Sequence, residues 1–349
     1  MRSPVPPIEL TGTDDHLGHP AVVPPDGFVD ELRSICEAVA VDADATAEAS
    51  RDWWPLALHW SLAGRVAKRA ALVVRPTTSE QVAAVLSLCN RSGVPVTAAG
   101  GRSGVCGASI PVFGGVVLDL TALDTVRVVD AESGVVEVDP GVFGPDLERV
   151  LNTHHGLTIG HFPQSFDLAT VGGWVACRGA GQYSTRYGKI EDMVVGLEIA
   201  LADGRLIRTG GSPAAAVGPD LTQLFVGSEG TLGVITRVWL RAHPVPTTQR
   251  SAAYRFGSVH DGFEACRRIL RRGATPAVLR LYDAVESKRG HGGDGTTCTL
   301  LVVDEGDTSL VDATMSVVAA ESEALGERAE DELVDHWFEH RNDTSALQG

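Results

Sequence analysis

The sequence predicts an α+β protein of two domains, and three observations support this fold class. From residue 71 the chain alternates strand and helix patterns: ALVVRP, then a long amphipathic run, then VPVTAAGG. Two pairs of alternating apolar runs are each joined by a turn sequence, one of them Asp203-Gly204, which is typical of β-hairpins. Past Pro246 a new strand, helix and strand pattern begins, and we expect a second domain there.

The composition predicts a globular protein of the cytoplasm. The 349 residues are 44% hydrophobic, which is enough to bury a sizeable core. A formal charge of −16, from 45 acidic and 29 basic residues, argues against a nucleic-acid surface, because Lys and Arg carry phosphate binding. The six cysteines are scattered without a C-x-x-C pair and are expected to be reduced thiols. We find no signal-peptide pattern and no apolar run of about 18 residues, so no membrane helix is expected.

Residues 1–70 are expected to form an N-terminal extension that docks on the rest of the chain. A Pro-rich start precedes a helix expected over residues 28–40. Beyond the extension, Ser79 is expected to cap a helix that Gly93 ends. Serine accepts hydrogen bonds from the first turn of a helix, and glycine adopts the left-handed conformation after the last.

Residues 71–246 are expected to form the first domain, which is rich in strands. GGVVLDL is a predicted strand, TVRVVDAESGVVEVDPG and MVVGLEIALADGRLIRTGG are predicted hairpins, and PDLERVLNTHHG is a predicted helix. Residues 247–349 give strands and amphipathic helices and stop at a helical pattern, ELVDHWFEHRNDTSALQG. We therefore expect residues 247–349 to be the start of a substrate domain that the chain does not complete.

A glycine cluster follows the strand at residues 94–99. It reads Gly100-Gly101-Arg102-Ser103-Gly104, and a further strand follows it rather than a helix. The cluster is neither a G-x-G-x-x-G fingerprint nor a P-loop, since the spacing fails and no Gly-Lys-Ser/Thr follows. Two interpretations stay open: a nest of N–H groups that binds phosphate oxygens, or a glycine-rich turn that binds nothing.

Two further segments have the same ambiguity. In residues 161–189 a polar stretch leads into Val171-Gly172-Gly173 at the expected start of a helix, where missing side chains would let a diphosphate approach backbone N–H groups. The turn at residues 227–233 has three glycines spaced by three and enters a strand, which is equally typical of a β-bulge. The presence of all three segments in one chain favours a shared ligand.

In these segments the chain resembles the FAD-binding domain of the vanillyl-alcohol oxidase and p-cresol methylhydroxylase superfamily. The likeness rests on GGRSG, PQSFDLATVGGWVACRGAG, YGKIEDMVVGLEIALADG and VGSEGTLGVIT, in this order, between about residues 71 and 246. Within the superfamily the chain is similar to the alkyldihydroxyacetonephosphate synthases and to bacterial FAD-linked oxidases of the glycolate-oxidase and D-lactate-dehydrogenase type. The resemblance implies an α+β flavoprotein with a two-part FAD-binding domain and an α+β cap domain.

The resemblance also implies four segments that contact FAD. The first, which wraps the pyrophosphate, falls on Ala98, Ala99, Gly100, Gly101, Arg102, Ser103 and Gly104. The second falls on Gln164, Ser165, Phe166, Asp167, Leu168, Ala169 and Thr170, and the third on Cys177, Arg178, Gly179 and Ala180. Both run along the diphosphate toward the isoalloxazine. The fourth, which lines the adenosine and the flavin, falls on Glu229, Gly230, Thr231, Leu232, Gly233, Val234 and Ile235.

The chain departs from the family pattern at two of these positions and carries no histidine for a covalent link. Arg102 stands where the family usually has a third glycine, and Gln164 where it usually has Glu or Asp. Relatives with a histidyl-linked flavin have a segment like RSGGH, whereas this chain reads RSGVC. Cys106 is either a thioether candidate or a packed small residue. We expect non-covalent FAD.

Arg280 is the one residue that the resemblance places at the substrate. In the synthase-like relatives an arginine in a cap strand faces the anionic head of the substrate, and VLRLY resembles that strand. A guanidinium binds phosphate and carboxylate equally well, and the alternative is an exposed strand arginine. The chain ends before the acid/base motifs of the relatives, so we assign no catalytic residue and predict no metal.

Three functions remain open on the sequence. The first is an FAD-dependent oxidoreductase that acts through flavin N5 on a small anion resembling a 2-hydroxy acid. The second is a transferase like alkyldihydroxyacetonephosphate synthase, with FAD N5 as a covalent carrier and no net oxidation. The third is a truncated FAD-binding protein without turnover. The expected partners are a small anionic substrate and, as one option, a second copy of the chain.

Overall fold

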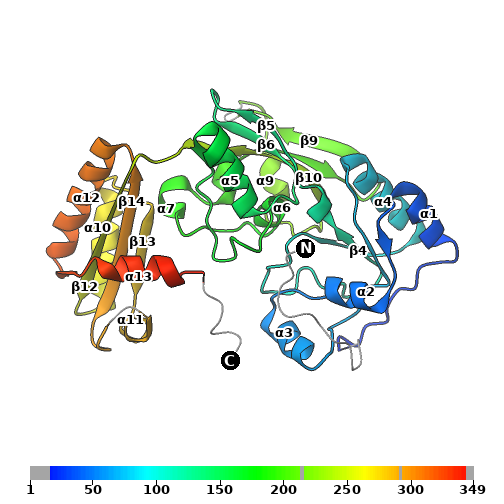
Figure 1. Ribbon diagram of the computed structural model, residues 1–349, viewed down its shortest axis with the longest axis horizontal. Coiled ribbons are helices and arrows are strands. Elements are labelled where there is room, and N and C mark those ends of the chain that lie inside the picture. The colour runs from blue at the N-terminus through cyan, green and yellow to red at the C-terminus, as the bar shows by residue number, and fades with distance from the viewer. Residues whose placement is uncertain (1–15, 213–215, 291–292, 343–349) are drawn as a thin grey trace. The chain divides into compact units, whose positions relative to one another are not determined.

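A computed structural model describes residues 16–212, 216–290 and 293–342 of the chain. The described residues form two compact units (Figure 1). Unit 1 takes in the residues up to Ile159 together with Ser165–Gly179 and Met193–Ala242, and unit 2 takes in Gly160–Gln164, Ala180–Asp192 and the residues from His243 onward. The described helices are all too short or too polar to cross a lipid bilayer.

Unit 1 contains a four-stranded sheet in which β2, β4 and β3 run parallel (Figure 1). Its strands in sheet order are β1 (Val39–Ala40), β2 (Leu72–Val74), β4 (Val116–Asp119) and β3 (Val96–Ala99). Helices α1 (Phe28–Ile35) and α4 (Ser79–Ser92) share one buried apolar core with these strands. Helices α2 (Ala43–Ala49) and α3 (Pro55–Leu62) complete the N-terminal part. The end of β3 opens into the first glycine cluster.

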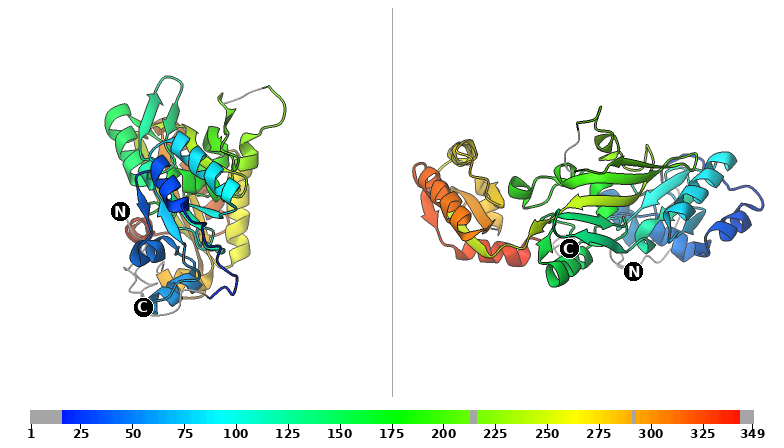
Figure 2. Two further views of the ribbon diagram at one scale, coloured as in Figure 1. Left: turned by 90° about the vertical axis from the view of Figure 1, so that its right-hand side faces the viewer. Right: turned by 90° about the horizontal axis from the view of Figure 1, so that it is seen from above.

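A second sheet of unit 1 is antiparallel, and its strands lie side by side in Figure 2. Their order is β5 (Val126–Asp130), β6 (Val135–Val138), β10 (Val234–Arg241), β8 (Val194–Ala200) and β9 (Leu206–Gly210). The connecting elements are η1 (Leu120–Ala122), α5 (Gly144–His155), β7 (Leu157–Thr158), α6 (Val171–Ala176) and α9 (Thr222–Phe225). Because α6 and β10 belong to this part, the second, third and fourth predicted segments lie at the ends of its elements.

Unit 2 is built on one antiparallel sheet with helices on both faces. The strands in sheet order are β13 (Val278–Tyr282), β14 (Cys298–Gly306), β12 (Thr248–Phe256) and β15 (Glu327–Ala329). On one face, α10 (Val259–Arg271) and α12 (Thr308–Glu323) bury side chains such as Ile269 and Val318. On the other face, α13 (Glu332–His340) buries Val334 and Trp337. The remaining elements are α7 (Ser184–Tyr187), α8 (Ile190–Met193), β11 (His243–Pro244) and α11 (Ala284–Gly290).

Most of the predicted elements are confirmed. Strands β5 and β6 form the first hairpin, and β8 and β9 form the second. Gly93 ends α4 in the left-handed conformation as expected, but the cap of this helix is Thr78, whose side chain accepts from the N–H of Gln81. The helix expected over residues 28–40 is wrong in its second half: it ends at Ile35, and Val39–Ala40 pairs with β2 as a strand.

Candidate functional site

Successive backbone N–H groups after strand β3 find no acceptor within the described chain, and the first four of them lie in the glycine cluster. These four belong to Gly101, Arg102, Ser103 and Gly104, which we call the N–H loop. Gly101 and Arg102 are buried residues. Buried backbone N–H groups are almost always paired, and successive unpaired ones form a concave site for an anion. The N–H loop is therefore the strongest candidate for a phosphate-binding element in this part of the chain.

The N–H loop is held against the second predicted segment by direct backbone contact. A β-carbon on Gly101 would lie 1.8 Å from the carbonyl oxygen of Leu168. A β-carbon on Gly100 would lie 2.4 Å from Oγ1 of Thr170. Both distances are far below van der Waals contact, so only glycine allows the two segments to come this close. The structure thus brings the first and second segments together.

The glycine pair at the start of α6 has a different role from the predicted one. The N–H of Val171 donates to the carbonyl of Val142, and that of Gly172 donates to the carbonyl of Pro140. The N–H of Gly173 donates to Oγ1 of Thr170, which caps the helix. A β-carbon on Gly172 would lie 2.5 Å from Pro140. The interpretation of residues 171–173 as diphosphate donors is therefore wrong: close packing explains the glycine, and the three N–H groups already have acceptors.

The third and fourth predicted segments also meet in unit 1. The N–H of Gly227 donates to the carbonyl of Val175, and that of Glu229 donates to the carbonyl of Ala176, each at 3.0 Å. A β-carbon on Gly227 would lie 3.0 Å from the β-carbon of Arg178. The turn at residues 227–229 is thus fixed against the C-terminal end of α6.

Three described residues other than glycine have a positive φ angle, and each lies in a predicted cofactor segment. They are Arg102 with φ 53°, Arg178 with φ 54° and Glu229 with φ 47°. Left-handed backbone is unfavourable for residues with a β-carbon and is concentrated at binding sites, where the surrounding structure enforces it. The strained positions mark the first, third and fourth segments as parts of one functional region.

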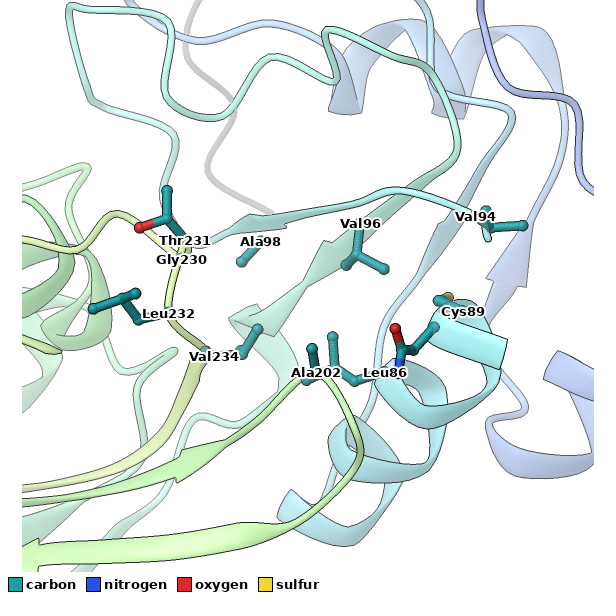
Figure 3. A pocket seen from close by; sticks show the side chains of 12 residues that line it. Leu86, Cys89, Val94, Val96, Ala98, Ala202, Gly230, Thr231, Leu232 and Val234 are labelled. Carbon is teal, nitrogen blue, oxygen red and sulfur yellow. The ribbon is translucent and has the colours of Figure 1, made fainter. Parts of the chain in front are cut away.

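A cavity of about 240 Å³ lies beside these segments in unit 1 (Figure 3). Ala98 of the first segment and residues 230–234 of the fourth line it, together with Val96, Ala202 and side chains of α4. Its lining side chains are mostly apolar, whereas ligands of drug size fill pockets of roughly 300–1,000 Å³. The cavity is therefore large enough for one ring system at the end of a larger ligand, and backbone atoms between its apolar side chains offer that ring polar contacts.

The side chain of Arg102 is engaged by the N-terminal extension. Its Nη1 donates to the carbonyl of Glu48 at 2.9 Å, and its Nη2 lies 3.6 Å from the carboxylate of the same residue. Arg51, which is almost fully buried, donates from Nε to that carboxylate at 3.0 Å. Burial lowers the pKa of Arg102, and the Asp119 and Glu48 carboxylates oppose this shift. Arg102 therefore adds positive charge beside the N–H loop while its guanidinium is bound to α2.

Replacing Glu48 by glutamine is expected to destabilise the protein by about 2 kcal/mol, because two buried guanidinium groups each lose one of the negative charges that act on them. Urea unfolding of the FAD-free protein measures this change. Glu286→Gln is the matched control, since Glu286 is exposed and pairs with the exposed Arg289; it should change the free energy of unfolding by less than about 0.5 kcal/mol. Equal effects of the two substitutions would contradict the described network.

Sequence reasoning missed Glu48 and Arg51. The arginine at position 102, where a glycine was expected, is the signal that a carboxylate must lie near it. The sequence does not show which of the 45 acidic residues that is. Only the docking of α2 on the loop after β3 reveals it.

Other predicted site residues fall elsewhere or have structural contacts. Gln164, Ala180 and Arg280 belong to unit 2. Phe166 stacks on Trp174 at 6.3 Å between ring centroids, so its ring packs within the protein. Cys106 is exposed. Desolvation and the Glu229 carboxylate raise the pKa of Cys177, which makes this thiol a poor nucleophile.

His161 is fully buried in unit 2, and desolvation lowers its pKa to about 4. In the unfolded chain its pKa is about 6.5, so below that pH the unfolded state binds a proton that the folded state excludes. The free energy of unfolding should therefore fall by about 2 kcal/mol between about pH 7 and pH 5. Urea titrations at several pH values measure this loss of unfolding free energy. The loss should disappear in His161→Gln. It should persist in the control His260→Gln, since His260 is exposed on α10. A wild-type slope in His161→Gln would contradict the assignment.

The comparisons with known proteins agree with this geometry. Residues 70–210 match a family described as "FAD binding domain". The chain is 36% identical over 282 residues to the FAD-linked oxidoreductase YgcU of Escherichia coli strain K12, covering 78% of this chain and 57% of that protein. It is 33% identical over 212 residues to glycolate oxidase subunit GlcD of Bacillus subtilis, covering 60% and 45%. The chain thus spans about half the length of the curated relatives it matches.

A solved structure of alkyldihydroxyacetonephosphate synthase has the same fold. The two superpose with a TM-score of 0.79 and 25% sequence identity over 98% of this chain and 67% of the synthase. The predicted α+β fold with a FAD-binding domain is confirmed.

Proposed function

Residues 70–210 belong to the FAD-binding domain family, and from this premise we propose that the protein is an FAD-dependent oxidoreductase acting on a small anionic substrate. The observation that carries the proposal is the N–H loop. Its four N–H groups fit the diphosphate of FAD, because they lack acceptors in the described chain and follow a strand at a glycine-rich turn. When bound, FAD accepts a hydride at N5.

Different residues of the chain bind different parts of the cofactor in this proposal. The N–H loop holds the diphosphate, and the Arg102 and Arg51 guanidinium groups lie on the same side as the α2 residue Glu48, whose carboxylate and that of Asp119 partly offset the charge of Arg102. The cavity beside Ala98 and Gly230, which is lined by apolar side chains and by backbone atoms, takes an uncharged ring of the cofactor. The predicted segment at residues 164–170 supports the N–H loop through Leu168 and Thr170.

FAD is held without a covalent bond in this proposal. Cys106 is exposed, and the raised pKa of Cys177 keeps its thiol protonated at neutral pH. Denaturing the protein in acid should release all of its flavin into the supernatant. Flavin that stays with the precipitated protein would contradict non-covalent binding.

Substrate binding is assigned to residues 247–349, as the start of the substrate domain. Arg280 lies on β13, where its guanidinium has no ion pair among the described residues. A guanidinium fork binds a carboxylate through two N–H groups and fixes its orientation. Glycolate oxidase subunit GlcD, among the relatives, points to a 2-hydroxy acid as the substrate class.

Anaerobic mixing of the FAD-loaded chain with glycolate, D-lactate and L-lactate tests the proposed reaction. We expect at least one of them to remove the visible absorbance of the oxidised flavin within seconds to minutes. A yellow protein that no 2-hydroxy acid reduces would contradict it and would favour an FAD-binding protein without turnover.

A transferase reaction is the second candidate, because the likeness to alkyldihydroxyacetonephosphate synthase extends over 98% of this chain. Such a reaction exchanges an acyl for an alkyl group without net oxidation. Loss of flavin absorbance on adding an acyl dihydroxyacetone phosphate, with no reduction of any added electron acceptor, would favour this candidate. The cytoplasmic location and the homodimer stay predictions of the sequence.

A further inference from the structure

Two arginines of unit 2 share one aromatic ring. The guanidinium carbon of Arg280 lies 5.7 Å from the centroid of the Trp337 ring, and that of Arg341 lies 5.4 Å from it. Arg280 comes from β13, and Arg341 follows the last turn of α13. Segments about 60 residues apart in the chain therefore bring two positive charges to the same indole.

Further aromatic rings fix both guanidinium groups. Arg280 also lies 5.4 Å from the ring of Tyr282. Arg341 lies 5.5 Å from the ring of Tyr183. Stacking on aromatic faces restricts the plane of a guanidinium and leaves its N–H edge available for a ligand. We call these five residues the Trp337 cluster.

The two charges have no counter-charge in the described chain. Neither Arg280 nor Arg341 has a carboxylate within ion-pair distance among the described residues, and Nη1 of Arg341 is buried without an acceptor there. The carboxylates whose charges act on the tyrosines of the cluster have other partners: Glu305, near Tyr183, accepts from the Tyr187 hydroxyl at 2.7 Å, and Glu286, near Tyr282, lies 3.6 Å from Arg289.

Both arginines are half-buried, and a buried cation without a partner is unfavourable. In a chain with a net charge of −16, two such cations on one ring are the arrangement expected of a site for a doubly charged anion.

We propose that Arg280 and Arg341 form a single site at Trp337 for a ligand head group with two negative charges, a phosphate monoester or a dicarboxylate. The proposal rests on the proposed function in one respect, since it takes this head group to belong to the substrate. It adds Arg341 as the second cation and narrows the substrate class from a small anion to a dianion.

Isothermal titration of the FAD-loaded 349-residue chain tests the site. The probes are glycerol phosphate, malonate and lactate at equal ionic strength, and at a pH above the second pKa of the phosphate, which is about 6. We expect one dianion to bind at least about 10-fold more tightly than lactate, because a second charge-assisted hydrogen bond is formed. Tighter binding of glycerol phosphate identifies a phosphate ligand, and tighter binding of malonate identifies a dicarboxylate.

Variants locate the second charge. Arg341→Gln should weaken binding of the dianion about 10-fold and change binding of lactate less than about 2-fold, whereas Arg280→Gln should weaken both. Arg341→Lys keeps the charge and should retain most of the preference. Arg289→Gln is the control, since Arg289 is an exposed arginine of unit 2 on α11, and it should change neither. Thermal unfolding and FAD content show whether each variant is folded.

The site would be overturned by equal affinity of the wild type for lactate and both dianions, by absence of binding, or by an equal loss in Arg341→Gln and Arg289→Gln. If Arg341→Gln does not fold, the affinities of the wild type for lactate and for the two dianions decide whether the dianion site exists. If dianion binding depends on Arg341 but no substrate reduces the flavin, the result would support the dianion site and contradict the proposed oxidoreductase function.

Discussion

Alanine at position 101 is expected to abolish FAD uptake and to destabilise the protein by about 3 kcal/mol or more. The β-carbon of alanine would lie 1.8 Å from the carbonyl oxygen of Leu168 and 2.9 Å from its carbon. Both are backbone atoms, so no side-chain rotation relieves the clash, and the N–H loop must move away from the second segment. Urea unfolding and an FAD titration measure the two effects.

Gly104→Ala is the matched control in the same loop. No heavy atom lies within 4 Å of a β-carbon at Gly104, so the free energy of unfolding without FAD should change by less than about 1 kcal/mol. The added methyl group would occupy the space next to the N–H groups, and the dissociation constant of FAD should rise about 10-fold. Wild-type stability of Gly101→Ala would refute the close approach, and wild-type FAD affinity of Gly104→Ala would place the diphosphate elsewhere.

Replacing Arg280 by glutamine is expected to lower kcat/KM for the anionic substrate about 100-fold, because a charge-assisted hydrogen bond to the substrate contributes about 1.5–3 kcal/mol. The dissociation constant of FAD should not change, since none of the described contacts that hold the N–H loop involves Arg280. Stopped-flow reduction of the bound flavin measures the first quantity, and a fluorescence titration measures the second.

Two further variants delimit this effect. Arg280→Lys should recover part of the loss, because the ammonium keeps the charge but not the two-pronged geometry. Arg289→Gln should reduce its flavin as fast as the wild type. Reduction of the Arg280→Gln flavin at the wild-type rate would remove Arg280 from the substrate site.

The sequence was most informative where the signal is local. Alternation of apolar residues around short turns predicted both hairpins of unit 1, because strand pairing across a tight turn depends on neighbouring residues alone. The end of α4 was also predicted correctly, because a glycine such as Gly93 commonly ends a helix in the left-handed conformation. The glycine cluster at residues 100–104 was correctly singled out, although the unpaired N–H groups that make it a candidate site are visible only in the structure.

The features that the sequence could not show depend on contacts between distant segments. Gly172 and Gly173 look like ligand-binding glycines, but the packing of Gly172 on Pro140 is a long-range contact that no local pattern reveals. The partnership of Arg102 with Glu48 joins positions 54 residues apart. No local sequence pattern singled out Arg341, because its proposed role depends on the Trp337 ring, which the guanidinium groups of both Arg341 and Arg280 contact.

The most direct test of the central claim, that the N–H loop holds the diphosphate of FAD, is a competition titration of the flavin-free chain. Fluorescence quenching of added FAD should show one FAD bound per chain, and ADP, which carries the same diphosphate, should compete with it. FMN, which has a single phosphate, should bind at least about 10-fold more weakly than FAD. Failure to take up FAD, or binding of FMN as tight as that of FAD, would contradict the account.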